Sequence, residues 1–282
     1  MKKHIILIIA IVFSTSFTAL AADPTSSPKR IISLAPSMTE ILYALGLGDQ
    51  IVGVTTFCDY PEDAKKKPKI GGMSNPSLEA VISLKPDVVV MTTDGNPKEF
   101  NDRLIELKVK TFVFEARRLV ELPQGIRDLG AALGVKDRAD RLARDIEDGI
   151  KRVKAMHTAA RAQQSGHPKK VLFIVWPEPL IVAGPGTVID DAITLLGEKS
   201  LAASAATAYP KYSIEEVLRQ APDVICIGRG RTSMNEVSQG LLARLSSVPA
   251  VKKGKVFYVS DQLYRLGPRV ISGIEELAEC LK

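Results

Sequence analysis

Two carboxylates stand at equivalent positions of a segment that occurs twice in the chain. Residues 77–90 and 213–226 align without insertion or deletion, and Ser, Glu, Val, Pro, Asp and Val keep the same offsets. Glu79 and Glu215 each fall in the first turn of an expected Ser-capped helix. Two exposed carboxylates related in this way can recognise two cations on a symmetric partner. The simpler interpretation is that each carboxylate complements its helix dipole, and one residue can do both.

Nothing in the sequence has the composition of a catalytic or metal centre. The three histidines are His4, His157 and His167. We expect them in the N-terminal leader, on a long helix and in the loop that follows this helix. Nucleophilic catalysis by Ser or Cys usually needs a neighbouring His, and zinc needs several closely spaced His or Cys ligands. The glycines at 71–72 and 184–186 indicate tight turns rather than a phosphate-binding loop. The sequence therefore favours ligand binding over catalysis.

Short apolar runs alternate with amphipathic segments along most of the chain. Strands are expected at residues 30–34, 51–55, 88–91, 111–114, 170–175 and 256–260, with helices at 36–45, 188–193 and 268–280. This alternation predicts an α/β protein with mainly parallel sheets covered by helices. Because the helix–turn–strand repeat occurs once in each half, we expect two similar lobes, and the cleft between such lobes is where ligands bind.

Residues 135–164 differ from the rest, being rich in Asp, Arg, Lys and Ala, with no Pro and a single Gly. Their apolar side chains recur at helical spacing, at Leu142, Ile146, Ile150 and Val153. The pattern predicts one helix of about 25–30 residues, about 40 Å long. Its place midway between the repeats predicts a rigid connecting helix (136–167) between an N-terminal lobe (23–135) and a C-terminal lobe (168–282). A simple surface helix is the alternative.

The N-terminus has the pattern of an export signal. Basic residues at 2–3 precede an apolar stretch at 5–13, and residues 19–21 match a small-x-small cleavage site. Residues 1–22 are therefore expected to be a signal peptide, cleaved near Ala21 or Ala22, that directs the mature chain to the periplasm or outside the cell. A membrane anchor would need a longer apolar span. No Cys lies at the cleavage site, which disfavours a lipid anchor.

The overall composition is that of an ordinary globular protein, with 45% hydrophobic and 25% charged residues among 282. The net charge of +6 is spread along the chain, and its short lysine runs are typical of solvated loops, so we expect no nucleic-acid partner. Cys58, Cys226 and Cys280 are odd in number, so at least one thiol is free or bonds another chain. Cys226 is expected to be buried. Disulfide pairing and ligand contact by Cys58 stay open.

Four motifs occur in order along the mature chain: Ser33-Leu34-Ala35-Pro36-Ser37-x-Thr39-Glu40, Cys58-Asp59-Tyr60-Pro61 after Val52-Gly53-Val54-Thr55, Gly71-Gly72-Met73, and the Leu-x-Pro-Asp-Val strand entry. Together they resemble the periplasmic substrate-binding proteins of ABC importers, in the branch with one rigid connecting helix that takes up vitamin B12, ferric siderophores and haem. The second and third motifs are most similar to vitamin B12-binding members. The resemblance implies a monomeric, non-enzymatic protein without a cofactor that delivers a corrinoid to a permease dimer at the inner membrane.

The resemblance also implies which residues hold the ligand between the lobes. They are Ser37, Phe57, Tyr60, Ile70 and Gly71 in the first lobe, and Trp176, Leu180, Tyr209, Asp261 and Arg265 in the second. A corrin is a broad apolar disc with neutral amide arms, and aromatic side chains suit it. Ile70 and Leu180 stand where B12-binding relatives would carry aromatics. Glu79 and Glu215 match the residues that dock onto basic residues of the permease.

Other ligands and other classes of function stay open. Haem would favour Tyr60 or Tyr209 as an axial ligand. A ferric siderophore would favour converging arginines, for which the candidates are Arg117, Arg229, Arg265 and Arg269. A metal-cofactor enzyme on a related two-lobed fold is a rival, because fold alone does not decide function; the export signal and the Glu pair favour transport. A secreted interaction module would leave the cleft aromatics without a role.

Overall fold

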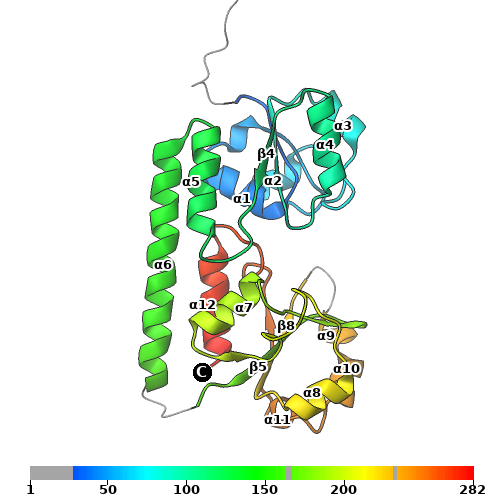
Figure 1. Ribbon diagram of the computed structural model, residues 1–282, viewed down its shortest axis with the longest axis vertical. Helices are drawn as coiled ribbons and strands as arrows, with labels where there is room; N and C mark the ends of the chain where they lie inside the picture. The colour runs from blue at the N-terminus through cyan, green and yellow to red at the C-terminus, as the bar shows by residue number, and fades with distance from the viewer. Residues whose placement is uncertain (1–27, 163–166, 231–233) are drawn as a thin grey trace, which may run out of the picture.

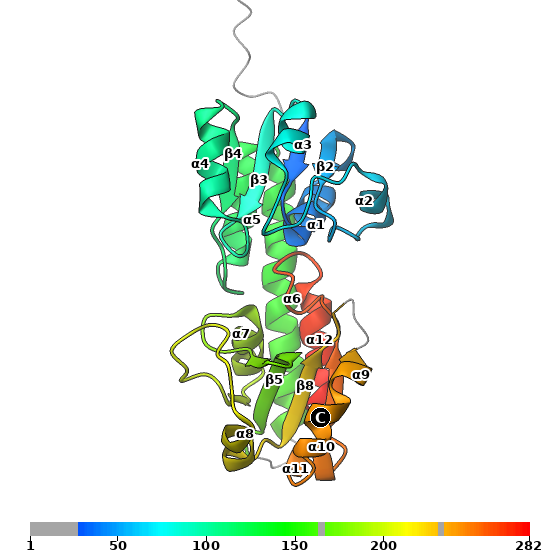
Figure 2. The same ribbon diagram turned by 90° about the vertical axis from the view of Figure 1, so that its right-hand side faces the viewer.

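The computed structural model describes residues 28–162, 167–230 and 234–282. Two α/β lobes lie one above the other along a single long helix, α6 (Lys136–Ala162), which confirms the predicted fold class (Figure 1). After a turn of 90° about the vertical axis, α6 runs behind both sheets (Figure 2). The predicted signal peptide and residues 163–166 of the predicted connecting helix lie outside the described residues. None of the described helices has both the length and the apolarity needed to cross a membrane.

The first lobe contains a four-stranded parallel sheet in the order β2-β1-β3-β4. Its strands are β1 (Ile31–Ser33), β2 (Ile51–Val54), β3 (Val88–Thr92) and β4 (Thr111–Phe114). Its helices are α1 (Pro36–Ala44), the 3₁₀ helix η1 (Gly48–Gln50), α2 (Glu62–Lys66), α3 (Leu78–Ser83), α4 (Lys98–Glu106) and α5 (Leu122–Ala132). Successive residues of β3 point to opposite faces, and both faces are covered by helices. A strand covered on both faces forms a nearly continuous apolar run, as β3 does from Val88 to Met91 before the buried Thr92.

The second lobe is built around β5 (Lys170–Pro177), in the order β6-β5-β8-β9 with a short β7 also paired to β5. Only β6, which follows β5 as a hairpin, is antiparallel among these described pairs. The other strands are β6 (Leu180–Val182), β7 (Lys199–Ser200), β8 (Val224–Gly228) and β9 (Val256–Val259). The helices are α7 (Val188–Leu195), α8 (Ile214–Gln220), α9 (Met234–Val237), α10 (Gln239–Arg244), α11 (Pro249–Lys252) and α12 (Val270–Cys280).

The repeated segment folds in the same way in both lobes. The Ser77 hydroxyl caps α3 by accepting a hydrogen bond from the Ala80 amide at 3.2 Å, and Ser213 caps α8 through the Glu216 amide at 3.1 Å. In each lobe a buried strand follows the capped helix, β3 after α3 and β8 after α8. The repeat in sequence is therefore a repeat in structure.

The turn between helix and strand is also repeated in detail. The residue before the Pro-Asp pair is Lys85 in one copy and Ala221 in the other, and both have left-handed φ angles of 46° and 48°. The Asp87 carboxylate then accepts a hydrogen bond from the Arg30 amide at 2.9 Å, just ahead of β1. Its counterpart Asp223 accepts one from the first amide of β5 at 2.9 Å. The Pro-Asp turn thus aligns each repeated strand with its neighbour.

The long helix α6 is fastened to both lobes. In the first lobe it packs against α5, where Arg127 donates to Glu147 at 2.8 Å. In the second lobe Gly149 allows Ile271 of α12 to approach the helix backbone, and buried His157 faces Glu198 at 3.4 Å. Because these contacts are spread along its length, α6 is a rigid spacer between the lobes.

The crossing of α5 and α6 gives the first prediction. A Cβ atom at Gly130 would stand 2.1 Å from the Cβ of Ala139, so the helices must separate to admit it. We expect Gly130→Ala to lower the free energy of unfolding by about 1–3 kcal/mol, because overpacking outweighs the gain in helix propensity. Gly240→Ala in α10 is the matched control, since nothing lies within 4 Å of that position. Urea unfolding measures both; a Gly130 variant as stable as the control would contradict the close crossing.

Candidate ligand cleft between the lobes

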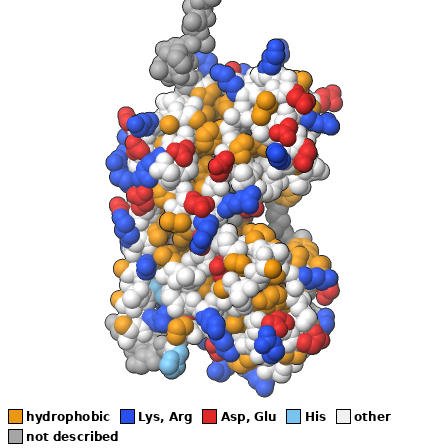
Figure 3. Space-filling view, viewed as in Figure 1, with side chains coloured by type: hydrophobic (Ala, Val, Ile, Leu, Met, Phe, Trp, Pro, Cys, Tyr) orange, Lys and Arg blue, Asp and Glu red, His pale blue; other side chains and the backbone are white. Residues whose placement is uncertain are grey.

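A cavity of about 260 Å³ lies between the lobes. The space-filling view shows the surface notched at this level, on the side away from α6 (Figure 3). Its walls are formed largely by residues that follow the carboxyl ends of strands. Ser37 lies in the first turn of α1, after β1, and Asp94 and Arg265 lie in the segments after β3 and β9. Binding sites of parallel α/β sheets form at this end of the strands. The cavity is therefore the candidate ligand site.

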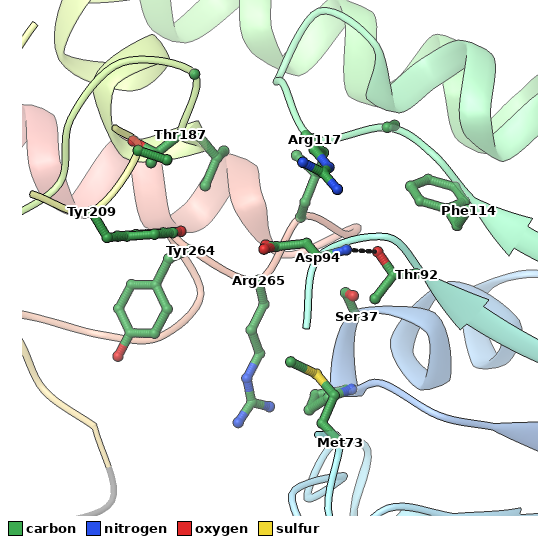
Figure 4. Close-up of a pocket in the computed structure, with 16 residues that line it drawn as sticks. Ser37, Met73, Thr92, Asp94, Phe114, Arg117, Thr187, Tyr209, Tyr264 and Arg265 are labelled. Carbon is green, nitrogen blue, oxygen red and sulfur yellow. Dashed lines mark hydrogen bonds between the residues drawn. The ribbon is translucent and has the colours of Figure 1, made fainter. Parts of the chain in front are cut away.

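Three of the residues predicted from the sequence line this cavity. Ser37 comes from the first lobe, and Tyr209 and Arg265 come from the second (Figure 4). The lining residues that the sequence analysis did not single out include Asp94, Phe114, Thr187, Tyr264 and Leu266. The sequence holds a signal for two of them. Phe114 is the last residue of the expected strand 111–114, and Asp94 comes shortly after the expected strand 88–91.

Phe57, Tyr60 and Trp176 do not line the cavity but have exposed side chains. Phe57 and Tyr60 lie in the loop after β2, and Trp176 lies near the end of β5, where its indole Nε1 donates to the Glu178 carbonyl at 2.8 Å. Tyr209, which lines the cavity, is only partly buried, with 46% of its surface exposed. Large aromatic side chains left accessible on the cleft side of both sheets are suited to contact a broad apolar ligand.

The side chains of Ile70 and Leu180 do not reach the cleft, which corrects their predicted place in the site. Ile70 is 1% exposed and packs with Val81 in the core of the first lobe, and Leu180 is 6% exposed in the core of the second. Both are aliphatic side chains whose burial is favourable, so the lobe cores retain them. Gly71, with φ of 102°, forms a turn in which its carbonyl accepts from the Thr56 amide.

A charged cluster joins the two lobes beside the cavity. From the second lobe, Arg265 Nη1 donates to Asp59 Oδ1 at 2.6 Å and to Glu40 Oε1 at 3.2 Å, while its Nη2 contacts Asp261 Oδ2 at 2.6 Å. Arg269 donates from Nε to Glu40 Oε2 at 2.9 Å and from Nη2 to Glu40 Oε1 at 2.6 Å. These five residues form the interlobe ion cluster. Predicted ligand residue Asp261 is thus directed at Arg265 and does not line the cavity.

A second contact between the lobes lies nearer to α6. Arg118 of the first lobe binds Asp191 of α7. The Nε atom of Arg118 lies 3.0 and 3.2 Å from the two carboxylate oxygens of Asp191. The Leu119 amide adds a hydrogen bond to Asp191 Oδ2 at 2.9 Å. The cleft is consequently bounded by ionic contacts at two places, both made between side chains far apart in the sequence.

Comparison with known proteins identifies the kind of molecule to which this cleft belongs. Residues 31–263 match the family described as periplasmic binding protein. The chain belongs to that family. Its members are substrate-binding proteins of transport systems and not enzymes.

Two similar proteins of known structure bind different ligands, vitamin B12 and heme, and a third similar protein is uncharacterized. An uncharacterized ABC transporter substrate-binding lipoprotein of Bacillus subtilis, YvrC, is 34% identical over 261 residues, which cover 90% of this chain and 80% of the relative. The periplasmic vitamin B12-binding protein BtuF of Vibrio cholerae has a TM-score of 0.78 at 26% identity, covering 90% of this chain and 97% of that one. The periplasmic heme-binding protein RhuT of Roseiflexus sp. RS-1 has a TM-score of 0.80 at 29% identity, covering 89% and 97%.

In the cleft of this binding protein, the charges of Arg265 and Arg269 are paired with neighbouring carboxylates. Burial by itself lowers the pKa of Arg265, but the hydrogen bond that Arg265 donates to Asp59 and the charges of Asp261, Asp59 and Glu40 raise it above its ordinary value. The hydrogen bonds that Arg269 donates to Glu40 likewise raise the pKa of Arg269, whose guanidinium also lies 4.0 Å from the ring centre of Tyr60. Three carboxylates thus face two guanidiniums, and the cluster offers no excess positive charge.

Arg117 and Tyr209 are two further polar residues of the cavity lining, beside the negatively charged Asp94. Arg117 donates from Nε to Thr93 Oγ1 at 3.0 Å and from Nη2 to the Thr93 carbonyl at 2.9 Å. Burial, and then the negative charge of Asp94, raise the pKa of Tyr209 to about 12, so its phenol is protonated at neutral pH.

No group of three His, Cys, Asp or Glu side chains among the described residues could hold a metal ion. Cys58 is buried and its sulfur lies 3.1 Å from both the Thr39 and the Thr55 hydroxyl oxygen. Cys226 is buried as predicted, and no disulfide joins the three cysteines. Beside the interlobe ion cluster, the cavity lining is aromatic, aliphatic and polar, and it includes the charged side chains of Asp94 and Arg117.

The interlobe ion cluster gives the second prediction. Arg269→Ala removes two of the hydrogen bonds that hold buried Glu40, so we expect a loss of about 3 kcal/mol in the free energy of unfolding. Arg152→Ala is the control, because its 3.7 Å pair with Glu275 is exposed and should contribute less than about 1 kcal/mol. Denaturant unfolding of both variants decides the point. Equal losses would show that burial of Glu40 does not depend on Arg269.

Proposed function

We propose that this protein captures a corrinoid in the cleft, in the periplasm, and delivers it to the permease of an ABC importer. The observation that carries this choice is the pairing of the cleft guanidiniums. Arg265 and Arg269 face Glu40, Asp59 and Asp261, so they have little charge left for an anionic ligand. A corrinoid with neutral amide arms needs hydrogen bonds and apolar surface rather than free cations.

The exposed aromatics support the same ligand. Phe57 and Tyr60 of the first lobe and Trp176 and Tyr209 of the second offer apolar faces on the cleft side. The cavity of about 260 Å³ is smaller than the ~300–1,000 Å³ of typical small-molecule sites. We therefore infer that a broad disc would lie across the mouth of the cavity, against these rings, with one edge in the cavity.

Heme is the second candidate, and the 29% identical heme-binding relative favours it. Its iron would require an axial ligand such as His or deprotonated Tyr. The buried His157 lies on α6 against Glu198, away from the cavity lining. The raised pKa of Tyr209 disfavours the deprotonated form. A ferric siderophore is less well supported, because Arg229 is directed at the Tyr258 carbonyl and Glu276 rather than into the cavity.

The third prediction concerns the ligand itself. The mature protein should bind cyanocobalamin one-to-one, detected by isothermal titration at neutral pH. Hemin and a ferric catecholate siderophore serve as comparison ligands in the same buffer. Clear binding of either comparison ligand with no heat from cobalamin or cobinamide would sink the corrinoid assignment and leave the family assignment standing.

We further infer that Glu79 and Glu215 are the contacts to the permease. Both are exposed on the first turns of α3 and α8, one in each lobe. Figure 1 shows these helices on the side of the molecule away from α6. Neither residue lines the cavity. Two equivalent carboxylates would orient the protein on a permease dimer that presents a cation on each half.

The fourth prediction reverses these two charges. Glu79→Lys with Glu215→Lys should abolish uptake by cells, since attractive contacts with permease cations become repulsive, while corrinoid affinity stays unchanged. Each single variant should give a partial defect. Glu99→Lys with Glu236→Lys is the control, because these two exposed carboxylates also occupy first turns, of α4 and α9. Normal uptake by the Glu79→Lys, Glu215→Lys variant would contradict docking and show that both residues only complement their helix dipoles.

A further inference from the structure

An exposed aliphatic side chain accompanies each of the two proposed docking carboxylates. Ile82 of α3 is 37% exposed and Leu218 of α8 is 39% exposed. They occupy equivalent positions of the repeated segment, three residues after Glu79 and Glu215. Residues three apart on a helix are neighbours on its surface. Each lobe therefore presents a carboxylate beside an aliphatic group.

The packing of the lobes does not account for this exposure. The side of each helix that faces its sheet is filled by Val81 in α3 and Val217 in α8, which are fully buried. A single exposed aliphatic residue is ordinary on a protein surface. Here the same exposure recurs at one position of two lobes, although neighbouring positions have diverged, with Ser83 in one copy and Arg219 in the other. The recurrence points to a shared use.

We propose that each lobe docks onto the permease through a two-point contact, a carboxylate and the aliphatic side chain one helical turn further along. This inference rests on the proposed docking function of Glu79 and Glu215. The partner is a membrane protein with two equivalent halves, each presenting a cationic side chain next to an apolar surface. Figure 2 shows α3 and α8 both in front of α6, one in the upper and one in the lower lobe, so a single partner can meet both.

The two points of contact have different physical dependences. The carboxylate attracts its cation over a distance and loses strength as salt screens the charge. The aliphatic side chain acts only at contact, in proportion to the apolar area that is removed from water, and salt screening does not weaken it. The carboxylates would thus guide the approach, and Ile82 with Leu218 would stabilise the docked complex.

Salt dependence separates the two contributions. The binding assay uses the corrinoid-loaded protein and its importer reconstituted in lipid nanodiscs, at ~50 mM and ~500 mM NaCl. Ile82→Ser with Leu218→Ser should weaken binding about tenfold at both salt concentrations. Glu79→Gln with Glu215→Gln should weaken it at low salt and flatten its salt dependence. The control is Ile105→Ser with Leu107→Ser, which alters two more exposed side chains at the end of α4 and should leave binding unchanged.

The outcomes distinguish this inference from the function on which it rests. If the Gln variant weakens binding and the Ser variant at Ile82 and Leu218 does not, the carboxylate docking stands and the two-point contact is overturned. If neither variant affects binding, or the unaltered protein does not bind the importer, both fail. If the Ser variant instead dissociates a dimer of the free protein in sedimentation, these side chains serve self-association and the two-point contact is overturned. Corrinoid titration and thermal unfolding of each variant verify that the fold and the cleft are intact.

Discussion

The buried carboxylate of Glu40 is the constraint on which the arrangement of the two lobes depends. A carboxylate removed from water must be paired, and the hydrogen bonds that hold Glu40 come from Arg265 and Arg269 of the other lobe. The carboxylate of Glu40 in the first lobe is therefore paired only when the second lobe is in place. Arg118 and Asp191 make a second contact of this kind, and α6 sets the separation. The cavity lies between the lobes, whose relative position is set by the Glu40 ion pairs, the Arg118–Asp191 contact and α6.

The same pairing that holds the lobes together also shapes what the cleft can bind. The guanidiniums of Arg265 and Arg269 are already committed to Asp59, Asp261 and Glu40. What the cleft still offers is aromatic surface, the protonated phenol of Tyr209, and two side chains of opposite charge, Arg117 and Asp94. Interlobe contact and ligand preference are thus two consequences of one set of ion pairs. Because of this coupling, a cleft beside two partly buried arginines suits a neutral ligand.

The internal repeat links folding to docking. A Ser cap, a left-handed residue and an Asp that binds the neighbouring strand's amide recur in both lobes, and together they set the direction of α3 and α8. Because these features orient the helices, they also orient Glu79 and Glu215 toward solvent at equivalent places. A partner with two-fold symmetry would meet two similar surfaces on a single chain, and a repeat inside one polypeptide supplies them without dimerisation.

The sequence by itself determined the local and periodic features of this protein. The helical spacing in 135–164, the apolar strands and the Ser-capped repeat depend on neighbouring residues. The structure has a helix at Lys136–Ala162, strands at the apolar runs and a Ser cap on α3 and on α8. The tertiary structure alone decided which side chains reach the cleft. Ile70 and Leu180 were assigned to the site by position, but burial of aliphatic surface holds them in the cores. Arg265 pairs with residues 225 and 206 positions away, and contacts so distant have no signature in local spacing.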